Sequence, residues 1–274
     1  MKKFLAVLLS ACVLAGSAIA FSACGDGRET LTVYTNAAFA PWEYLNEYGE
    51  VAGVDVDIAR ELGDILGYNV EIRDVSFGSI FTNVQNDEMS IGAAGITITE
   101  DRLESGIFSI EYATSTQYAI IPDSMNTAEN KNGDKLKMSA LAGKRIGTQE
   151  STTGNILISD AINGTEDEET GEHVQGELEG TGATVVDYRN GILAGDNLGG
   201  QIDVLVIDEL PAKSIGEGKQ GYVVIELDAE PESYGIYMNK NATELKKKID
   251  TALQVMIDNG VIDYLILKHS GAII

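Results

Sequence analysis

The chain has 274 residues, of which 43 are acidic and 19 are basic, so its formal net charge is −24 at pH 7. With 44% apolar and 23% charged residues it has the composition of a soluble globular protein, which excludes a fibrous or a disordered chain. Its length fits one or two domains with a sizeable core. We do not expect nucleic acid as a partner, because phosphate backbones are bound by clustered Lys and Arg.

The N-terminal residues have the pattern of a secretory signal. A short basic region precedes an apolar stretch over residues 4–23, which ends in small residues directly before Cys24. This exit resembles the bacterial lipobox, although Phe21 replaces the usual Leu, and the resemblance implies that Cys24 is diacylated on its sulfur. We therefore expect a signal peptide at 1–23 and a lipidated linker at 24–30. The alternative is an uncleaved membrane helix, since about 18–20 apolar residues span a bilayer.

The cysteine count supports a lipid anchor. The chain has two cysteines, Cys12 and Cys24, so cleavage would leave Cys24 alone and no internal disulfide. Two acyl chains hold a domain stably, at about 0.8 kcal/mol per buried CH₂. An acidic surface is repelled by anionic lipid, so a covalent tether must hold it. We expect a secreted protein anchored by lipid to the outer face of the cytoplasmic membrane, or on the periplasmic side.

After the linker, short apolar runs alternate with amphipathic helical patterns. The first block predicts strands at 31–35, 70–72 and 90–94 and helices at 57–67 and 80–85. The second block predicts strands at 117–121, 145–148, 183–187, 203–207 and 233–239, and helices at 154–162, around 210–215, 242–258 and 261–268. Strands that alternate with helices favour parallel α/β units. The two blocks predict two lobes.

The stretch 163–182 contains seven acidic residues and no Lys or Arg. We interpret it as a solvated surface excursion. Calcium capture is the alternative, but the stretch lacks the ligand spacing of an EF-hand loop.

Arg102 is the first candidate for ligand chemistry. It follows the predicted strand at 90–94, and Thr99 has the character of a helix N-cap, which places Arg102 in the first helical turn. A cation there opposes the helix dipole by about 0.3–1 kcal/mol. Two interpretations stay open. The side chain pairs with neighbouring acidic residues, or it binds an anionic ligand bidentately at the carboxyl end of the strand.

Two further candidates follow strands of the second block. Residues 151–154, Ser-Thr-Thr-Gly, open a helix whose free N–H groups suit a carboxylate or phosphate, although plain N-capping gives the same pattern. The segment has no phosphate-loop Lys, so nucleotide binding is not supported. Asp208 ends a buried run, where it either pairs with a ligand ammonium in the crevice or caps the next helix.

Aromatic residues follow the first two strands, and catalytic patterns are poor. Phe39, Trp42 and Phe77 either cover the edge of the core or sandwich the apolar stem of a ligand. The two histidines, His173 and His269, lie in the acidic stretch and the C-terminal helix, and the sequence has no nucleophile elbow and no His-rich metal spacing. We expect no catalytic residue, metal or cofactor.

Four stretches together resemble the bacterial extracellular solute-binding proteins of family 3, which serve polar amino-acid ABC importers. They are GVDVDI at 53–58, AGITITEDR at 94–102, DVLVID at 203–208 followed by Pro211 and Ala212, and YGIY at 234–237. The resemblance covers about residues 31–268. It implies an α/β, two-lobe periplasmic-binding-protein type II fold with two crossover strands, near 114–118 and 233–236, and the ligand between the lobes. Lobe 1 would comprise 31–113 plus 234–274, and lobe 2 would comprise 114–233.

The resemblance also implies roles for single residues. Arg102 and the backbone N–H of Thr153, in the helix start that includes Thr152, would bind the α-carboxylate of an amino acid. Thr97 and the backbone at Ala94 and Gly95 would lie beside the ligand's own backbone. Asp208 would bind the α-ammonium, Phe39 and Phe77 would flank the side chain, and Asn36, Trp42 and Gln149 would line its far end. Asn36 favours a neutral polar side chain such as that of glutamine, whereas Glu43 or Glu150 in the pocket would reverse this.

The expected function is that of a monomeric receptor for a free amino acid. Because the binding groups come from both lobes, the full set exists only in the closed cleft, which the permease of an ABC importer would recognise. Two other classes stay open, a cyclohexadienyl-type dehydratase on the same fold and a ligand-sensing module. The dehydratase would need a catalytic acid that no matched position offers.

Overall fold

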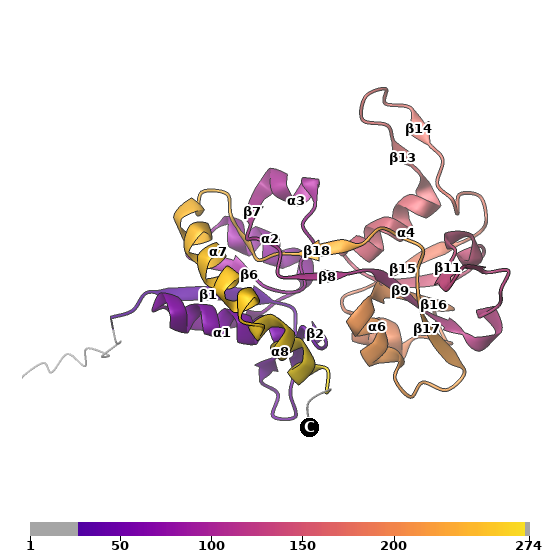
Figure 1. Cartoon of the computed structure of the whole chain (residues 1–274). Helices are drawn as coiled ribbons and strands as arrows, with labels where there is room; N and C mark the ends of the chain where they lie inside the picture. The colour runs from indigo at the N-terminus through magenta and orange to yellow at the C-terminus, as the bar shows by residue number, and fades with distance from the viewer. Residues whose placement is uncertain (1–26, 272–274) are drawn as a thin grey trace, which may run out of the picture.

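The computed structural model describes residues 27–271, which form two α/β lobes side by side (Figure 1). The signal peptide predicted at 1–23 and the predicted lipidation site Cys24 lie outside the described residues. Within 27–271, no helix is long and apolar enough to cross a bilayer.

The first lobe is built on a five-stranded sheet in the order β5-β1-β6-β19-β7. Strand β1 runs parallel to both β5 and β6, whereas β19 is antiparallel to its two neighbours β6 and β7. The bounds are β1 Thr30–Thr35, β5 Asn69–Asp74, β6 Ser90–Gly92, β7 Gly106–Phe108 and β19 Tyr237–Asn239. The C-terminal part of the chain therefore returns to complete the first sheet.

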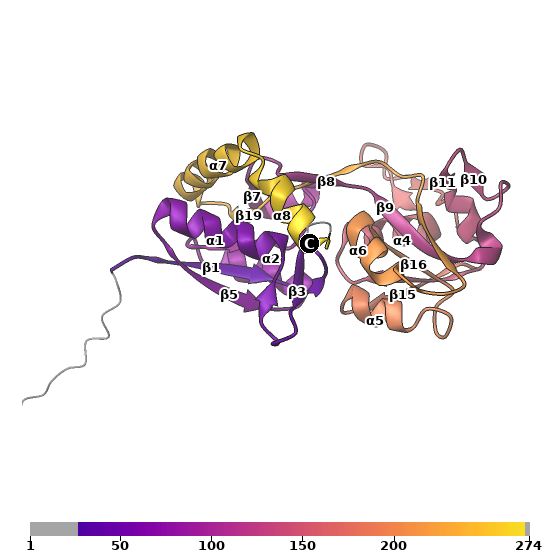
Figure 2. The ribbon, with the colours of Figure 1, turned by 60° about the horizontal axis from the view of Figure 1, so that its bottom comes forward.

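Helices of this lobe bury one apolar stripe each. Ile58 and Leu62 of α1 are buried, as are Leu245, Ile249, Leu253 and Met256 of α7, at the i, i+3 and i, i+4 spacing of one helical face. Helix α1 packs against α7 and α8, and α2 packs against β1, β6 and β19 (Figure 2). The bounds are α1 Val54–Leu66, α2 Phe77–Gln85, α3 Glu100–Ser105, α7 Thr243–Asp258 and α8 Val261–His269. A small sheet of β2 Ala38–Phe39, β3 Glu43–Leu45 and β4 Val51–Ala52 follows β1.

The second lobe repeats this plan. Its sheet has the order β15-β12-β16-β9-β17, with β12 parallel to β15 and β16, and with β9 antiparallel to β16 and β17. The strands are β9 Gln117–Pro122, β12 Arg145–Gln149, β15 Thr184–Tyr188, β16 Val204–Asp208 and β17 Tyr222–Glu226. The helices are α4 Thr153–Asn163, α5 Gly191–Asp196 and α6 Glu209–Gly216. Between β9 and β12 lie η1 Asp123–Met125, β10 Lys131–Asn132, β11 Lys135–Leu136 and η2 Met138–Leu141.

Two antiparallel strands cross between the lobes, as the resemblance implied. They are β8 Ala113–Ser115 and β18 Glu232–Tyr234, and they pair Glu232 with Ser115 and Tyr234 with Ala113 (Figure 1). Tyr234 also bridges to Thr97 of the first lobe. The expected division at 113/114 and 233/234 falls within these two strands, and it stays a prediction.

Several predicted elements are wrong in extent or direction. The strand predicted at 233–239 is two strands, β18 and β19, because the chain leaves the crossover and enters the first sheet there. The helix predicted from residue 57 begins at Val54, directly after Gly53. Gly53 has a φ of 137°, and a Cβ there would clash with the carbonyl oxygen of Trp42, so only glycine fits at this position. Strands β7 and β17 and the sheet β2-β3-β4 have no counterpart in the prediction. Both sheets also include antiparallel strands, where only parallel units are predicted.

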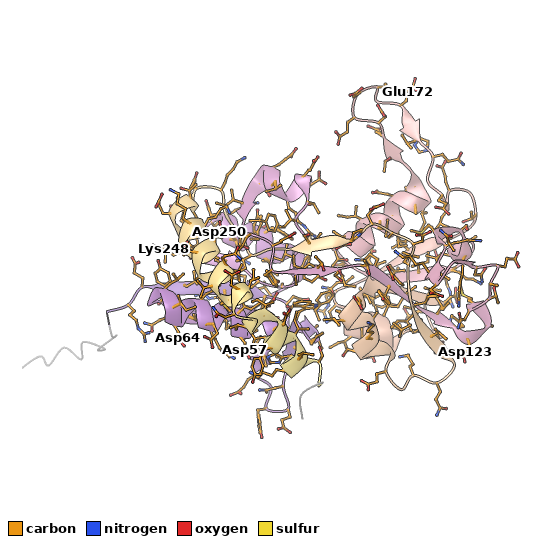
Figure 3. All side chains as sticks on the ribbon, in the orientation of Figure 1. Asp57, Asp64, Asp123, Glu172, Lys248 and Asp250 are labelled. Atoms are coloured by element: carbon orange, nitrogen blue, oxygen red, sulfur yellow. The ribbon has the colours of Figure 1, made fainter. Side chains whose placement is uncertain are left out.

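The acidic stretch is a projecting hairpin. Strands β13 Thr165–Glu166 and β14 His173–Val174 pair antiparallel at the top of Figure 1, and Glu172 lies near their tip in Figure 3. All four strand residues are exposed. The predicted surface excursion is confirmed, with the added feature that it is paired.

Candidate functional site

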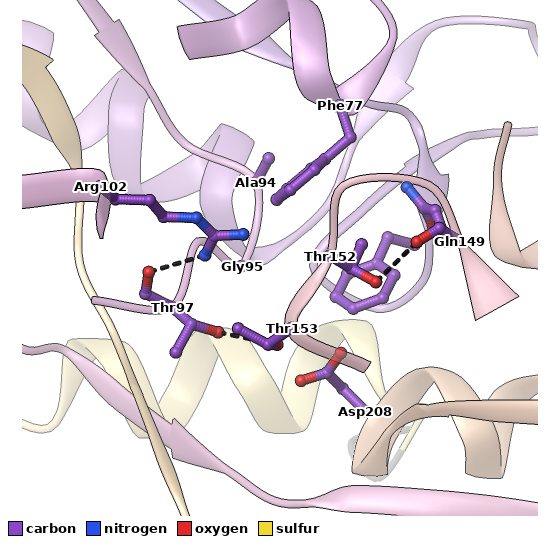
Figure 4. A pocket seen from close by; sticks show the side chains of 10 residues that line it. Phe77, Ala94, Gly95, Thr97, Arg102, Gln149, Thr152, Thr153 and Asp208 are labelled. Carbon is purple, nitrogen blue, oxygen red and sulfur yellow. Dashed lines mark hydrogen bonds between the residues drawn. The ribbon is translucent and has the colours of Figure 1, made fainter. Parts of the chain in front are cut away.

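A small cavity lies where the two lobes meet. Its volume is about 10 Å³, close to the space of one water molecule, so side chains from both lobes nearly touch across it. Ten residues line it: Phe39, Phe77, Ala94, Gly95, Thr97, Arg102, Gln149, Thr152, Thr153 and Asp208 (Figure 4). All ten are among the twelve residues predicted to bind a ligand, and the structure brings them together.

Arg102 projects into the cavity from the first turn of α3. Thr99 is the N-cap, as predicted, and its hydroxyl oxygen accepts from the Arg102 N–H at 3.3 Å. The guanidinium donates to the carbonyl of Thr97 at 2.7 Å and, across the lobes, to the carbonyl of Ser151 at 3.1 Å. It also lies over the rings of Phe77 and Phe81, at 5.5 and 5.1 Å from their centroids. Both hydrogen bonds go to neutral carbonyls, so its positive charge remains to attract an anion.

The electrostatic surroundings of Arg102 differ from those of a surface arginine. Burial lowers the pKa of its guanidinium, and the negative charges of Glu232 and Asp208 act against this shift. The neighbouring acidic residues Glu100 and Asp101, which offered the alternative interpretation, are exposed and accept no hydrogen bond from the guanidinium within the described chain.

The start of α4 faces Arg102 from the second lobe. Thr152 is the N-cap, since its hydroxyl oxygen accepts from the Asn155 N–H at 3.3 Å and its hydroxyl donates to the Gln149 carbonyl at 2.7 Å. Ser151 has a φ of 66°, a conformation that non-glycine residues rarely adopt and that turns the chain sharply into the helix. The first N–H groups of α4 therefore lie at the cavity, where the helix dipole favours a negative group.

Asp208 supplies the opposite charge from the end of β16. It stands at the N-cap position of α6 but its side chain makes no capping bond, which removes the alternative interpretation. Its carboxylate instead accepts from the hydroxyl of Tyr234 at 2.8 Å. Burial and the negative charge of Glu232 raise the pKa of Asp208 to about 7. A cationic group placed against this carboxylate would relieve both effects.

The backbone at Ala94 and Gly95 is held by a residue that the prediction did not assign. Asp55, in the first turn of α1, accepts from the Gly95 N–H at 2.7 Å and from the Tyr112 hydroxyl at 2.8 Å. Burial raises the pKa of Asp55 to about 6. Gly95 has a φ of 52°, and a Cβ there would lie 3.0 Å from the Phe39 ring. The sequence signal was the place of Asp55 in GVDVDI at 53–58, one of the four family stretches.

The predicted far end of the site is only partly present. Gln149 lines the cavity, donates to the amide oxygen of Asn36 at 3.1 Å and accepts from the Gly191 N–H at 3.1 Å. Asn36 lies behind Gln149 and donates to the Val75 carbonyl at 2.7 Å. Asn36 is therefore one contact removed from the cavity in this conformation.

Trp42 does not line the cavity in this conformation. Its ring packs edge-on against Tyr234 and Tyr112, with centroids at 5.1 and 6.2 Å, and only 2% of the residue is exposed. Trp42 is thus core beneath the site. Glu43 and Glu150, which would reverse the side-chain preference if they lay in the pocket, do not line it either, since Glu43 is buried in β3 and Glu150 is exposed.

Glu232 is a second residue that the prediction missed. It lies in the crossover strand β18, and its Oε2 accepts from the hydroxyl of Thr97 at 2.6 Å and from that of Thr153 at 2.8 Å. Its Oε1 accepts from the amide of Gln117 at 2.9 Å. No motif marks this position, because Glu232 is one of several acids in its part of the sequence and only the folded crossover brings it to the site.

Within residues 27–271, no group of three or more His, Cys, Asp or Glu side chains is arranged to hold a metal ion. His269 contacts Asp57 and Tyr44 at the end of the first lobe, and His173 contacts Glu179 in the acidic hairpin. Neither histidine is among the residues that line the cavity.

Comparisons with known proteins agree with this architecture. None of the curated proteins matches the chain. Among solved structures, the P235GK mutant of ArgBP from T. maritima is 26% identical with a TM-score of 0.73, over 89% of this chain and 96% of that one. An ancestral arginine-binding protein bound to arginine is 27% identical with a TM-score of 0.74, over 88% and 98%. Another structure, an ancestral arginine-binding protein bound to glutamine, is 27% identical with a TM-score of 0.71, over 88% and 97%.

These likenesses identify the two lobes and their crossover strands as a periplasmic-binding-protein type II fold. A family model matches residues 31–272, nearly all of the described chain. The chain belongs to the bacterial extracellular solute-binding proteins, family 3.

Proposed function

We propose that the protein binds a polar L-amino acid between its lobes and delivers it to the permease of an ABC importer. The observation that supports this most directly is the pair of opposite charges, Arg102 and Asp208, that the two lobes present to one cavity. The arginine-binding and glutamine-binding proteins among the similar structures support an amino acid as the ligand class.

An amino acid is a zwitterion, so its site needs a cationic corner and an anionic corner. Arg102 and the first N–H groups of α4 form the cationic corner, for the α-carboxylate. Asp208 forms the anionic corner, for the α-ammonium. Hydrogen bonds to charged groups contribute about 1.5–3 kcal/mol each, so a few of them supply the about 8 kcal/mol of a micromolar site.

Binding requires that the lobes move apart and close again. A cavity of about 10 Å³ is smaller than any amino acid, so the ligand enters an opened cleft. Because the cationic corner draws on both lobes and Asp208 belongs to the second, closure completes the set of contacts. The ligand thereby selects a closed form that a permease distinguishes from the open one.

For the ligand's side chain we propose a neutral polar group such as that of glutamine. Gln149 is the polar side chain at the far end of the cavity, and it is joined to Asn36 by a hydrogen bond between two neutral amides. Glu43 and Glu150, which would favour a basic side chain, are not among the lining residues. An arginine preference is the competing outcome.

The decisive experiment is a thermal-shift screen of the twenty amino acids. A selective ligand should raise the melting temperature with a stabilisation that follows RT ln(1 + [L]/Kd). Arginine and glutamine compete directly in this screen. Prephenate and arogenate are assayed separately for turnover, since turnover of either would replace a binding function with that of a dehydratase. Stabilisation by none of the twenty would contradict the proposal.

We further propose that Cys24 is lipidated and tethers the protein to the outer face of the membrane. The signal pattern before Cys24 supports this. Cells should incorporate labelled palmitate into the protein in a globomycin-sensitive manner. The Cys24→Ala variant should lose the label, and labelling that persists in this variant would refute the tether.

A further inference from the structure

Glu232 holds the two lobes together at the ligand site. One of its carboxylate oxygens accepts from the hydroxyl of Thr97, in the first lobe, and from the hydroxyl of Thr153, at the start of α4 in the second lobe, at 2.6 and 2.8 Å. The two hydroxyl oxygens are only 3.4 Å apart. Opening the cleft separates these threonines, so a single carboxylate oxygen can keep only one of the two bonds.

The threonines that Glu232 engages are ligand-site residues. Thr97 and Thr153 both line the cavity. A hydroxyl has one hydrogen to donate, and in this conformation both hydrogens go to Glu232. Neither hydroxyl can then donate to the carboxylate of an amino acid.

The rest of the Glu232 environment favours a carboxylate at this place. Its second oxygen accepts from the amide of Gln117, a residue that is 1% exposed, which fixes the orientation of the carboxyl group. Glu232 also lies near the positive charge of Arg102. Its negative charge raises the pKa of the Arg102 guanidinium, against the effect of burial. Glu232 thus lies among the groups proposed for a ligand carboxylate: two hydroxyls, a helix start and an arginine.

We propose that Glu232 is an internal latch that competes with the ligand's carboxylate for Thr97 and Thr153 and closes the cleft in the absence of amino acid. This inference rests on the proposed amino-acid function for its competitive part only. In the latched form the cavity is about 10 Å³, so latching and binding exclude each other. The measured affinity is then the intrinsic affinity multiplied by the unlatched fraction.

Removing a polar group from a binding site usually weakens binding. The latch predicts the opposite, that ligand affinity rises when the Glu232 carboxylate is removed. In Glu232→Gln the carboxylate becomes a neutral amide, whose oxygen forms weaker hydrogen bonds with the two threonine hydroxyls than a charged carboxylate oxygen does. We expect the dissociation constant of the amino acid to fall by about tenfold, measured by titration calorimetry. Glu232→Ala should act in the same direction.

Glu230→Gln is the matched control. Glu230 is exposed two residues earlier in the same segment, so it removes the same charge without touching the threonines. We expect its affinity to equal that of the wild type. Weaker binding in Glu232→Gln would overturn the latch and place Glu232 in contact with the ligand ammonium, and unchanged binding would overturn it as well.

A second measurement tests the latch without any ligand. Labels at Asp64→Cys and Asp123→Cys, both exposed and one in each lobe, report the distance between lobes in a background with Cys12→Ala and Cys24→Ala (Figure 3). We expect a closed population without amino acid, which Glu232→Gln shifts to longer distances and Glu230→Gln does not. Identical distributions would refute the latch. If no amino acid binds the wild type, the proposed function fails, while this comparison still decides the latch.

Discussion

Arg102 and Asp208 give the cavity two charged walls, one from each lobe. The two lobes have the same strand order, but the groups that contact the two charges differ. Arg102 lies beyond the end of β6 and Asp208 is the last residue of β16. The guanidinium rests on two backbone carbonyls and two aromatic rings. The carboxyl of Asp208 accepts from one tyrosine hydroxyl and lies near the negative charge of Glu232, and its pKa is raised to about 7.

This difference indicates that the carboxylate and the ammonium of an amino acid would be recognised in different ways. The Arg102 wall keeps its charge at all ordinary pH values, because an arginine does not lose its proton. The pKa of Asp208 is raised to about 7, so its carboxyl holds its negative charge less firmly than an ordinary aspartate. A ligand carboxylate therefore meets a permanent cation, whereas a ligand ammonium must recruit its counter-charge. The charge of Arg102 is thus permanent, whereas the charge of Asp208 depends on a protonation equilibrium.

The largest expected effect comes from breaking the permanent wall. In Arg102→Met the ligand carboxylate loses its cation, and the carbonyls of Thr97 and Ser151 lose a donor. We expect amino-acid affinity to fall by about 100-fold or more, measured by calorimetry, with the fold retained by circular dichroism. Arg60→Met is the control, because Arg60 is exposed on α1 and pairs only with Asp57 and the Val51 carbonyl within the described residues. Wild-type affinity in Arg102→Met would contradict the site.

Asp208→Asn should sharpen the contrast, because it weakens binding while it stabilises the fold. The pKa of Asp208 is raised to about 7 in the folded protein, whereas an aspartate in the unfolded chain has a pKa of about 3.9. The carboxyl therefore contributes its full stability below about pH 3.9, and this contribution is lost as the pH rises through 7. Replacing Asp208 with Asn should raise the free energy of unfolding at pH 7.5 by about 1–3 kcal/mol, and lower ligand affinity at least tenfold.

Asp203 provides the control of opposite sign for that experiment. It precedes β16, pairs with Arg145 at 2.7 Å, and has a pKa lowered to about 2 by this hydrogen-bonded partner. Its stabilisation is present above about pH 3.9 and is lost as the pH falls through 2. Because the pair is partly exposed, Asp203→Asn should destabilise the fold at pH 7.5 by under about 1 kcal/mol and leave binding intact. Urea unfolding distinguishes the two variants, and destabilisation by Asp208→Asn would contradict the account.

The titration of Asp208 also predicts a pH dependence of binding. Below its pKa of about 7 the carboxyl that pairs with the ligand ammonium is neutral, so affinity should fall by up to about 30-fold between pH 8 and pH 5.5. Calorimetry near pH 7 in buffers of different ionisation enthalpy should show proton release on binding. Asp208→Asn should abolish both effects. A flat pH profile in the wild type would mean that Asp208 does not meet the ligand.

The smallest effect is expected where neither charged wall is altered. Asn36→Asp introduces a carboxylate behind Gln149, in place of the amide oxygen that accepts from it at 3.1 Å. Glutamine should bind a fewfold more weakly and arginine more tightly, while the pH dependence at Asp208 persists. An unchanged ratio of the two affinities would show that the ligand's side chain does not extend toward Asn36.

Much of this arrangement was readable from local sequence. Arg102 and Asp208 follow apolar runs, and the ends of buried strands are where α/β folds present ligand groups. The fold class followed from alternating elements and from the four family stretches. Strand direction did not follow, because no local pattern in β9 or β19 indicates that they pair antiparallel, and only the path of the chain decides it.

The residues that sequence reasoning misplaced are those whose role depends on long-range packing. The family resemblance placed Trp42 at the site, but Tyr112 and Tyr234 enclose it from far along the chain. Asp55 and Glu232 were missed because each acts on partners at least 40 residues away. Such pairings carry no local pattern.

The most direct test of the central proposal is a crystal structure with the amino acid that the thermal-shift screen selects. We expect the ligand's carboxylate to lie on the Arg102 guanidinium and the start of α4, and its ammonium to lie on the Asp208 carboxylate. A ligand bound outside the cleft, or held in the cleft without contact to both Arg102 and Asp208, would contradict the account.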